Sequence, residues 1–179
     1  MLRQKGARIE KITAEIKALI TDMIETMNDS NGVGLAAQQV GHALQLTVLD
    51  VREATNRPST LQVDGREVAP EDYMPMVLIN PHLKLFDEPA SGPEGCLSFP
   101  EMFASIVRPG MTEVRALNEH GKEIEFKCGG LLARAIQHEY DHLQGILFID
   151  RMAKADKEEL KEQLEELQAK TKAELKKKK

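Results

Sequence analysis

The stretch GGLLARAIQHEYDHLQG, residues 129–145, decides the fold because it marks the place where a strand ends and a buried helix begins. Gly129 and Gly130 interrupt the strand pattern that precedes them. Apolar residues then recur at a spacing of three and four, which predicts a helix over Leu131–Leu143 with one apolar side. This helix carries the residues with the clearest chemical meaning in the chain.

Two histidines of this helix, His138 and His142, stand four residues apart in the motif HExxH. Four residues at about 100° each bring the two imidazoles within roughly 40° of each other around the helix axis. Both can therefore reach one metal ion, and Glu139 is placed to act as a general base on a water molecule there. Because a bare HExxH also occurs by chance on solvated helices, a catalytic site needs a third ligand as well.

Two known patterns would supply that third ligand downstream of the motif. Gly145 extends the motif to HExxHxxG, but Phe148 stands where metzincin proteases have their third histidine. A thermolysin-like site would use a downstream glutamate. The available ones lie in a solvated run of lysine and glutamate: Glu158, Glu159 and Glu162.

The two cysteines are the better candidates for the third ligand. Cys96 lies in the segment Glu94–Ser98 (EGCLS), where a glycine lets the backbone approach closely and a thiolate suits zinc or ferrous iron. Cys128 competes with it. Since a free thiol is more often a small buried apolar group, and the spacing favours neither residue, the choice between them stays open.

The segment GVGLAAQQ, residues 32–39, superficially matches the GxGxxA fingerprint of dinucleotide-binding proteins. That fingerprint requires a strand before it, whereas a helix and a turn precede it here. We therefore expect a flexible turn that enters a tight strand or loop. Gln39, at its end, could donate a hydrogen bond to a developing oxyanion or be an ordinary surface glutamine.

The remaining chain predicts an α+β fold, with short antiparallel or mixed sheets around the central HExxH helix. Apolar spacing predicts an amphipathic N-terminal helix over Ile9–Met27. Turn residues predict hairpins at Asp64-Gly65, inside the long polar segment 52–75, and at Glu119–Gly121. The expected strands are Leu44–Val51, Met76–Ile79, Ala104–Val107, Thr112–Leu117 and Glu123–Cys128.

The C-terminal segment 151–179 has a different composition, rich in lysine and glutamate. Its leucines at positions 160, 164 and 167 predict a charged helix that packs at the periphery, with the last lysines frayed. No repeat or linker divides the chain. We therefore expect residues 1–179 to form a single catalytic domain.

Length and composition limit the class of protein. With 179 residues, a net charge of −5 and 30% charged residues, the chain suits one globular domain and is not typical of a DNA-binding protein. Two cysteines do not make a disulfide framework, and no apolar run of about 18 residues or signal peptide is visible. We expect a cytoplasmic protein that does not bind DNA or membranes.

Three segments together, GVGLAAQQ (32–39), EGCLS (94–98) and QHEYDHLQG (137–145), resemble the signature motifs of peptide deformylase, in the same order. The resemblance extends over nearly the whole chain. It implies a metal-dependent hydrolase that removes the formyl group from the N-terminal N-formylmethionine of newly synthesised proteins and releases formate. It also implies one divalent metal ion, Fe²⁺, with Zn²⁺ as a common substitute.

Carried over by position, the metal ligands of the family fall on Cys96, His138 and His142. The resemblance thus favours Cys96 over Cys128. Glu139 matches the general base, which takes a proton from water and returns one to the leaving amine. Asp141 is expected to orient a ligand or to pair with an arginine.

The resemblance also assigns residues that would contact the substrate. Oxyanion donors match the side-chain amide of Gln39 and the backbone N–H of Leu97. Helix geometry adds an apolar pocket for methionine on the side of the helix that precedes His138. The expected substrate-binding residues are Val33, Gly34, Glu94, Gly95, Leu131 and Ala135.

Nascent formyl-Met polypeptides are the implied partners of such an enzyme, and a monomer is expected. The lysines of the C-terminal helix suit RNA phosphate, which makes the ribosome a second candidate partner. The compartment is expected to be a bacterial-type cytoplasm, with an organelle as the alternative. Two other readings are a metallopeptidase built on the same HExxH and a metal-binding or ribosome-associated module without activity.

Overall fold

The structure is a computed structural model that describes residues 1–177. The chain forms two compact units, one made of Met1–Ala90 with Arg108–Leu147 and the other of Ser91–Val107 with the chain from Phe148 onward. Of the four terminal lysines expected to be frayed, Lys176 and Lys177 belong to a helix, and Lys178 and Lys179 lie outside the described residues.

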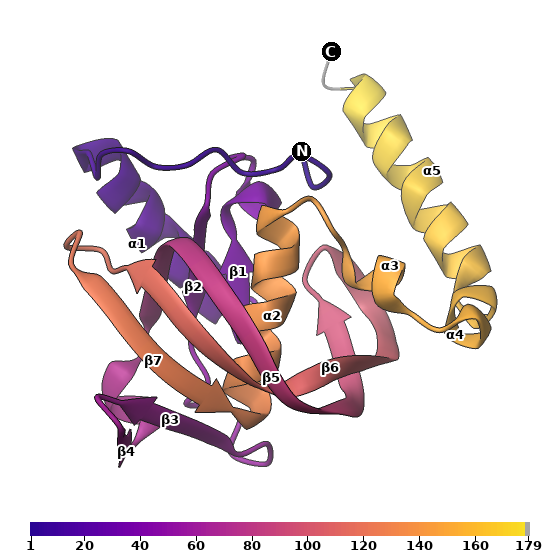
Figure 1. Cartoon of the computed structure of the whole chain (residues 1–179). Helices are drawn as coiled ribbons and strands as arrows, with labels where there is room; N and C mark the ends of the chain where they lie inside the picture. The colour runs from indigo at the N-terminus through magenta and orange to yellow at the C-terminus, as the bar shows by residue number, and fades with distance from the viewer. Residues whose placement is uncertain (178–179) are drawn as a thin grey trace. The chain divides into compact units, whose positions relative to one another are not determined.

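In the part of the chain that the structure describes, seven strands form one sheet in the order β1-β2-β5-β6-β7-β3-β4 (Figure 1). The pairs β1–β2, β2–β5, β3–β4, β3–β7 and β6–β7 are antiparallel. The strands are β1 (Gly34–Ala36), β2 (Leu46–Leu49), β3 (Ser59–Val63), β4 (Arg66–Val68), β5 (Met76–Cys96), β6 (Phe99–Leu117) and β7 (Glu123–Gly129). The predicted α+β class is confirmed, with one large sheet in place of several short ones.

Short predicted strands merge into the long strands β5 and β6 because local irregularities bend the strands without ending them. Asn80, Asp87 and Glu101 all have positive φ angles inside these strands. A residue of this kind is typical of a β-bulge, which kinks a strand while the pairing continues on both sides. The sequence pattern is interrupted at each such kink, so it predicts several shorter strands.

Within residues 1–177, five α-helices and two short 3₁₀ helices complete the fold. The α-helices are α1 (Ala14–Asp29), α2 (Gly130–Leu143), α3 (Phe148–Arg151), α4 (Lys154–Glu159) and α5 (Lys161–Lys177). The 3₁₀ helices are η1 (Ala37–Val40) and η2 (Pro70–Tyr73). Among the described residues, no helix is both long enough and apolar enough to cross a membrane.

The first helix begins later than its apolar spacing predicts. Thr13 caps it, because the Ile16 N–H donates to Thr13 Oγ1 at 3.4 Å. Ile9 is buried outside the helix, where its N–H donates to Asn80 Oδ1 at 2.9 Å and its carbonyl accepts from Asn80 Nδ2 at 2.8 Å. These two contacts with a residue far along the chain hold Ile9 in an extended segment.

Both predicted hairpins are present. Asp64 and Gly65 have φ angles of 51° and 75°, as a two-residue turn between β3 and β4 requires. The second hairpin joins β6 to β7, and the Gly121 N–H donates to the Asn118 carbonyl at 2.9 Å. The long segment 52–75 therefore contains a hairpin of the main sheet.

Strand β2 and the first residues of β5 (76–79) are covered on both faces, which explains why β2 is buried at every position. Leu49 and Leu78 belong to an apolar cluster with α2, whereas Val48 and Val77 belong to a second cluster with α1. Side chains alternate between the faces of a strand, so neighbouring residues enter different clusters. The helix α2 thus lies in the larger apolar cluster.

The first turn of α2 is held by the chain that enters β3. Leu131 N–H donates to the Pro58 carbonyl at 3.1 Å, and Leu132 N–H donates to Ser59 Oγ at 3.0 Å. Helix starts leave backbone N–H groups without partners inside the helix, and these two contacts satisfy two of them. The segment 52–75 therefore positions the helix that carries HExxH.

The other end of α2 is closed by Gly145, whose φ is 74°. Its N–H donates to the His142 carbonyl at 3.0 Å, and the Ile146 N–H donates to the Asp141 carbonyl at 2.9 Å. This pair of bonds is a Schellman motif, which favours glycine at the left-handed position. The glycine that extends HExxH to HExxHxxG therefore ends the helix.

Replacing Gly130 with alanine should lower the free energy of unfolding by at least about 2 kcal/mol. The backbone strain of a positive φ and a steric clash of the new Cβ both contribute to this loss. Gly130 has a φ of 65°, and a Cβ there would overlap the Pro58 carbonyl oxygen. Gly65→Ala is the matched control, since φ is 75° but no atom lies within 4 Å of the added Cβ. Urea denaturation should show a clearly larger loss for Gly130→Ala, and equal losses would contradict the close contact.

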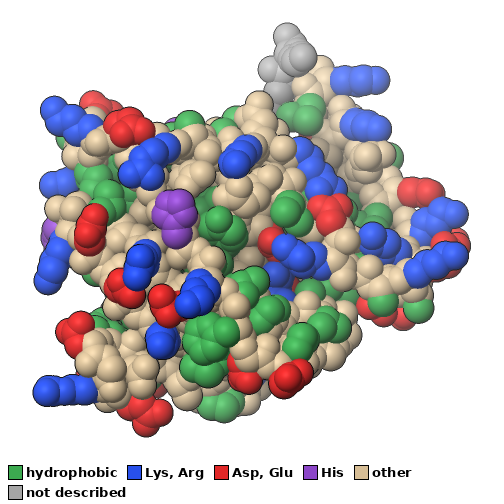
Figure 2. All heavy atoms as spheres, in the orientation of Figure 1, with side chains coloured by type: hydrophobic (Ala, Val, Ile, Leu, Met, Phe, Trp, Pro, Cys, Tyr) green, Lys and Arg blue, Asp and Glu red, His purple; other side chains and the backbone are tan. Residues whose placement is uncertain are grey.

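In the second unit, the ends of β5 and β6 form a hairpin whose turn holds Leu97 and Ser98. The rings of Phe99 and Phe148 pack edge to face, with centroids 5.4 Å apart. The single C-terminal helix expected from the sequence is divided at Leu160 into α4 and α5, and both are mostly exposed. Figure 2 shows acidic and basic side chains mixed over the visible face, with apolar side chains between them.

Candidate metal centre

The helix α2 presents both histidines of HExxH on one side. The rings of His138 and His142 lie with centroids 5.1 Å apart at an interplanar angle of 69°, and both side chains are buried. This arrangement follows from the i, i+4 spacing on a regular helix. The two imidazoles are therefore close enough to share a metal ion.

Burial determines the protonation state of the second histidine. Burial and, to a smaller extent, the neighbouring His138 together lower the pKa of His142 to about 3, while Asp141 acts in the opposite direction. His142 is thus neutral at physiological pH. A neutral imidazole is the form that binds a metal ion, so the protein environment suits this role.

Among the described residues, one group of side chains could hold a metal ion. Sγ of Cys96 and a ring nitrogen from each of His138 and His142 all lie within 4.8 Å of one another. One thiolate and two imidazoles form a donor set that suits zinc or ferrous iron. Three protein ligands also leave a coordination position for water, as catalytic sites require.

The other positions considered for the third metal ligand do not belong to this group of side chains. Cys128 is fully buried in the apolar cluster around α2, and burial raises the pKa of its thiol to about 12, which opposes formation of the thiolate. Phe148 packs against Phe99. The glutamates of a thermolysin-like site are exposed in α4 and α5: Glu158, Glu159 and Glu162.

Glu139 is buried beside Gly34, a glycine of the segment GVGLAAQQ (32–39). A Cβ added to Gly34 would lie 2.6 Å from Glu139 Oε1 and 2.9 Å from its Cγ. Gly34 belongs to β1, where it pairs with Leu49 of β2, so the backbone cannot easily move away. The missing side chain of Gly34 therefore makes room for the Glu139 carboxylate.

The turn before Gly34 leads into a buried strand, β1, which is one of the two forms expected for this segment. All three residues of β1 are buried, because the strand lies against both apolar clusters of the unit. The strand leads directly into η1 and Gln39. Gln39 Oε1 accepts the Ala36 N–H at 2.8 Å, which fixes the amide and makes Nε2 its donating end.

A buried ion pair supports α2 beside the second histidine. Arg108 Nη1 lies 2.9 Å from Asp141 Oδ2, and both side chains are buried. Gln137 Nε2 donates to the Pro109 carbonyl at 3.0 Å, on the same segment of β6. An arginine partner for Asp141 was expected, but the sequence did not indicate Arg108 because strand pairing alone brings it to α2.

The expected substrate-binding residues fall into two groups. Leu131 and Ala135 are buried in the larger apolar cluster, and Val33 packs against it. In the second unit, Glu94 is buried, and Leu97 is the first residue of the exposed turn. A Cβ on Gly95 would lie 2.6 Å from the ring of Phe103, a residue that the motifs did not single out.

A sequence profile of the polypeptide deformylase family matches residues 1–158. The chain belongs to the peptide deformylase family. The peptide deformylase of Methylacidiphilum infernorum is 43% identical over 167 residues, which cover 93% of this chain and 87% of that protein. The one from Clostridium botulinum is 44% identical over 154 residues, or 86% and 91% of the two chains.

Solved structures of the family show the same fold. Peptide deformylase 1B of Arabidopsis thaliana superposes with a TM-score of 0.81 at 35% identity, over 97% of this chain and 88% of that one. The enzyme of Synechococcus elongatus, solved with actinonin, has a TM-score of 0.76 at 36% identity, over 90% and 80%. This deformylase family member is therefore a metal-dependent hydrolase that removes the N-terminal formyl group from nascent proteins.

Proposed function

We propose that Cys96, His138 and His142 hold the catalytic metal and that the native ion is Fe²⁺, with Zn²⁺ as a working substitute. This assignment rests on the short distances between the Cys96 sulfur and the ring nitrogens of His138 and His142. A neutral His142 can bind such an ion, and a thiolate ligand from Cys96 suits both Fe²⁺ and Zn²⁺. Membership of a metal-dependent family supports it.

The metal assignment is tested by purifying the protein without oxygen. We expect about one iron ion for each chain and a loss of activity on exposure to air, because a ferrous site with a thiolate ligand oxidises. Zinc reconstitution should restore part of the activity. Full activity in a protein that contains only zinc after anaerobic purification would contradict iron as the native metal.

In the proposed mechanism Glu139 is the general base and then the general acid. A bound metal ion would supply a water molecule of lowered pKa and polarise the formyl carbonyl. Glu139 accepts the proton of the attacking water and later donates a proton to the nitrogen of the leaving amine. Its buried position beside Gly34 keeps the carboxylate in one place for both transfers.

Two donors are proposed to stabilise the negative charge that develops on the formyl oxygen. They are Gln39 Nε2 and the backbone N–H of Leu97. The hydrogen bond from Ala36 to Gln39 Oε1 supports this role for the glutamine, because it fixes which end of the amide can donate. One such donor typically contributes about 3 kcal/mol to lowering the barrier.

The methionine side chain is proposed to bind against α2. Val33, Leu131 and Ala135 share one apolar cluster, which supports a common role as the pocket surface. Gly34 and Gly95 would pair with the substrate backbone, as an added strand does. Glu94, buried at the end of β5, would anchor the loop that holds Cys96.

The reaction is tested with formyl-Met peptides and two readouts. We expect formate and the free amine in equal amounts, with no cleavage inside the peptide in the mass spectrum. Cleavage of internal peptide bonds would favour the metallopeptidase alternative. Metal binding without either product would favour a module that lacks activity.

Replacing Gly34 with alanine should lower kcat for formate release by about 10²-fold with little loss of metal. The added Cβ would lie 2.6 Å from Glu139 Oε1, so the carboxylate must move, and displacement of a catalytic group by about 1 Å has effects of this size. Kinetics on samples of matched metal content measure the effect. A wild-type kcat would contradict the role proposed for Glu139.

We also propose that residues 1–179 act as one catalytic domain, as a monomer in a bacterial-type cytoplasm, with α5 as a ribosome contact. The exposed lysines of α5, which include Lys170, Lys172 and Lys176, suit RNA phosphate. Deleting residues 165–179 should reduce co-sedimentation with ribosomes at low salt. Unchanged co-sedimentation would contradict the contact, and a dimer in sedimentation analysis would contradict the monomer.

A further inference from the structure

A groove of about 850 Å³ lies in the first unit, between α1, the end of β3, the segment Asp72–Val77 and the hairpin that joins β6 to β7. Its lining contains none of the proposed ligands, catalytic residues or substrate-binding residues. The size is typical of a ligand site, and the catalytic function does not account for it. The groove therefore needs its own explanation.

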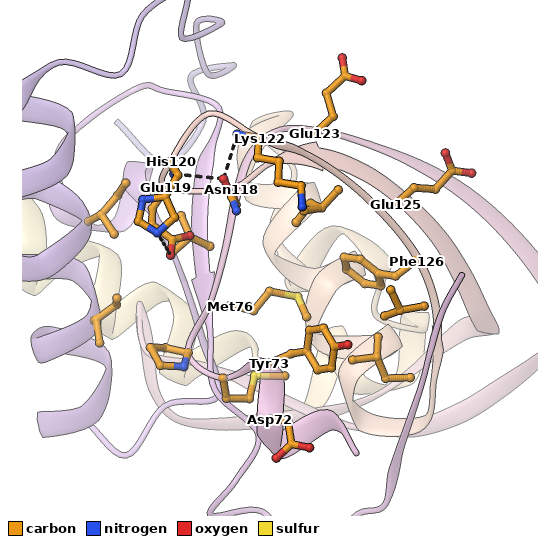
Figure 3. Close-up of a pocket in the computed structure, with 18 of the residues that line it drawn as sticks. Asp72, Tyr73, Met76, Asn118, Glu119, His120, Lys122, Glu123, Glu125 and Phe126 are labelled. Atoms are coloured by element: carbon orange, nitrogen blue, oxygen red, sulfur yellow. Dashed lines mark hydrogen bonds and ion pairs between the residues drawn. The ribbon is translucent and has the colours of Figure 1, made fainter. Parts of the chain in front are cut away.

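The floor of the groove is apolar. Ile20 and Ile24, one helical turn apart on α1, form one wall, and Met76, Ile124 and Phe126 come from the sheet. Figure 3 shows Met76, Tyr73 and Phe126 around the central space, with charged side chains at its margins. A ligand that fills this floor must present apolar groups.

One side of the groove is an unpaired strand edge. Strand β7 pairs with β6 along its whole length, from Glu123 to Gly129. On its other side β3 pairs only with Phe126–Gly129, because the chain turns away after Val63. Within the described residues, Glu123–Glu125 therefore has no strand partner on that side, and an extended peptide can add there.

The direction of the side chains on this edge sets the pattern that a peptide must follow. Ile124 is half-buried and Phe126 is buried, whereas Glu123 and Glu125 are exposed on the opposite face of β7. The side chains of a strand added beside β7 would point alternately to the same two faces. Its apolar residues would face the floor, and the residues between them would lie beside the two glutamates.

The charge of the groove favours a basic partner. Five carboxylates and two lysines line it, which gives a net charge of −3 with His120 neutral. Arg115 Nε binds Glu125 at 2.9 Å, but no ion pair holds Glu123 or Asp72 in the part of the chain that the structure describes. Lysine or arginine opposite this edge would therefore gain a favourable cross-strand partner.

The upper rim of the groove is preorganised. Asn118 Oδ1 accepts the backbone N–H of His120 at 3.0 Å and that of Lys122 at 2.9 Å. The Asn118 N–H in turn donates to the Lys122 carbonyl at 3.0 Å. Because these bonds already fix the turn that precedes β7, a peptide would bind without ordering it.

We propose that this groove binds an extended protein segment in which apolar residues alternate with lysine or arginine. The segment pairs its backbone with Glu123–Glu125 of β7. Its apolar residues lie on the floor beside Ile124, and its basic residues lie beside Glu123 and Glu125. This interaction is separate from removal of the formyl group.

The test uses the full chain and two synthetic peptides, acetyl-KVKVKVK-amide and acetyl-EVEVEVE-amide. Methyl NMR spectra should show saturable shifts of the Ile20, Ile24 and Ile124 signals with the lysine peptide. We expect the glutamate peptide to bind at least about tenfold more weakly. No binding of the lysine peptide at millimolar concentration, or shifts confined to other methyl groups, would overturn the proposal.

A charge exchange tests the pairing directly. The variant Glu123→Lys/Glu125→Lys should reverse the preference, so that the glutamate peptide binds more tightly than the lysine peptide. The matched variant Asp22→Lys/Glu25→Lys, whose residues are exposed on α1 outside the groove, should keep the wild-type preference. Both variants should keep wild-type formate release. An unchanged preference in the first variant would overturn the proposal.

A modified peptide tests the contribution of the backbone. Methylation of alternate amide nitrogens removes donors for strand pairing but keeps the charge and the apolar side chains. We expect the lysine peptide methylated on the amides that face β7 to lose at least about tenfold in affinity, and the one methylated on the other set to keep it. Equal affinity of both methylated peptides and the parent would overturn the strand-addition geometry.

Discussion

Replacing Glu139 with glutamine is expected to lower kcat for formate release by a factor of about 10²–10⁴ while the metal stays bound. Glutamine keeps the size of the side chain, which matters because Gly34 leaves little spare room beside it. It cannot accept a proton, so the attacking water loses its base. Steady-state kinetics and metal analysis on the same samples measure the two effects separately.

Glu159→Gln is the control for this experiment, because Glu159 is exposed in α4. It should keep the wild-type kcat and metal content. A near wild-type kcat for Glu139→Gln would show that another group accepts the proton. Loss of the metal from that variant would instead indicate that Glu139 binds the ion.

Replacing Cys96 with alanine is expected to reduce bound metal to below about a tenth of the wild-type content and to abolish turnover. The other two ligands would remain, but two imidazoles alone hold a divalent ion weakly. Metal analysis after dialysis and the formate assay provide the measurements. The proposal fails if Cys96→Ala keeps a full complement of metal.

Cys128→Ala is a matched control because it removes the same thiol from a different place. Cys128 is fully buried in the apolar cluster around α2, so its loss should cost about 1–2 kcal/mol of stability through the cavity that it leaves. Metal content and turnover should stay at the wild-type level. The reverse result for the two cysteines would exchange their roles.

Local features of the fold could be predicted from the sequence because short-range chemistry determines them. Asp64-Gly65 forms the expected turn, since both positions need positive φ and these residues tolerate it. The helix over Leu131–Leu143 also matches α2, because its apolar spacing and its position after two glycines agree.

Features that depend on distant contacts could not be predicted in this way. The apolar spacing continues from Ile9 into α1, yet Asn80 draws Ile9 into an extended segment. The positive φ angles of Asp87 and Glu101 likewise lie in strands whose pairing partners a single pattern does not reveal. In each case tertiary contacts override a local preference.

In the candidate site too, the features set by local geometry could be predicted, and those that depend on distant contacts could not. The approach of His138 and His142 follows from helix geometry alone. The third ligand does not, because the sequence contains two cysteines and only the folded chain shows which is buried in the core. Arg108 was missed for a related reason, since it lies on β6, far in sequence from its partner Asp141.

The two contacts that Pro58 and Ser59 make with the start of α2 restrict how this protein can be recombined with its relatives. Chimeras that exchange residues 52–57 for a segment of equal length, with Ala54 kept for its packing against the larger apolar cluster, should remain foldable. Grafts that shift Pro58 and Ser59 by one residue relative to β3 would instead leave the first turn of the histidine-bearing helix without its two acceptors.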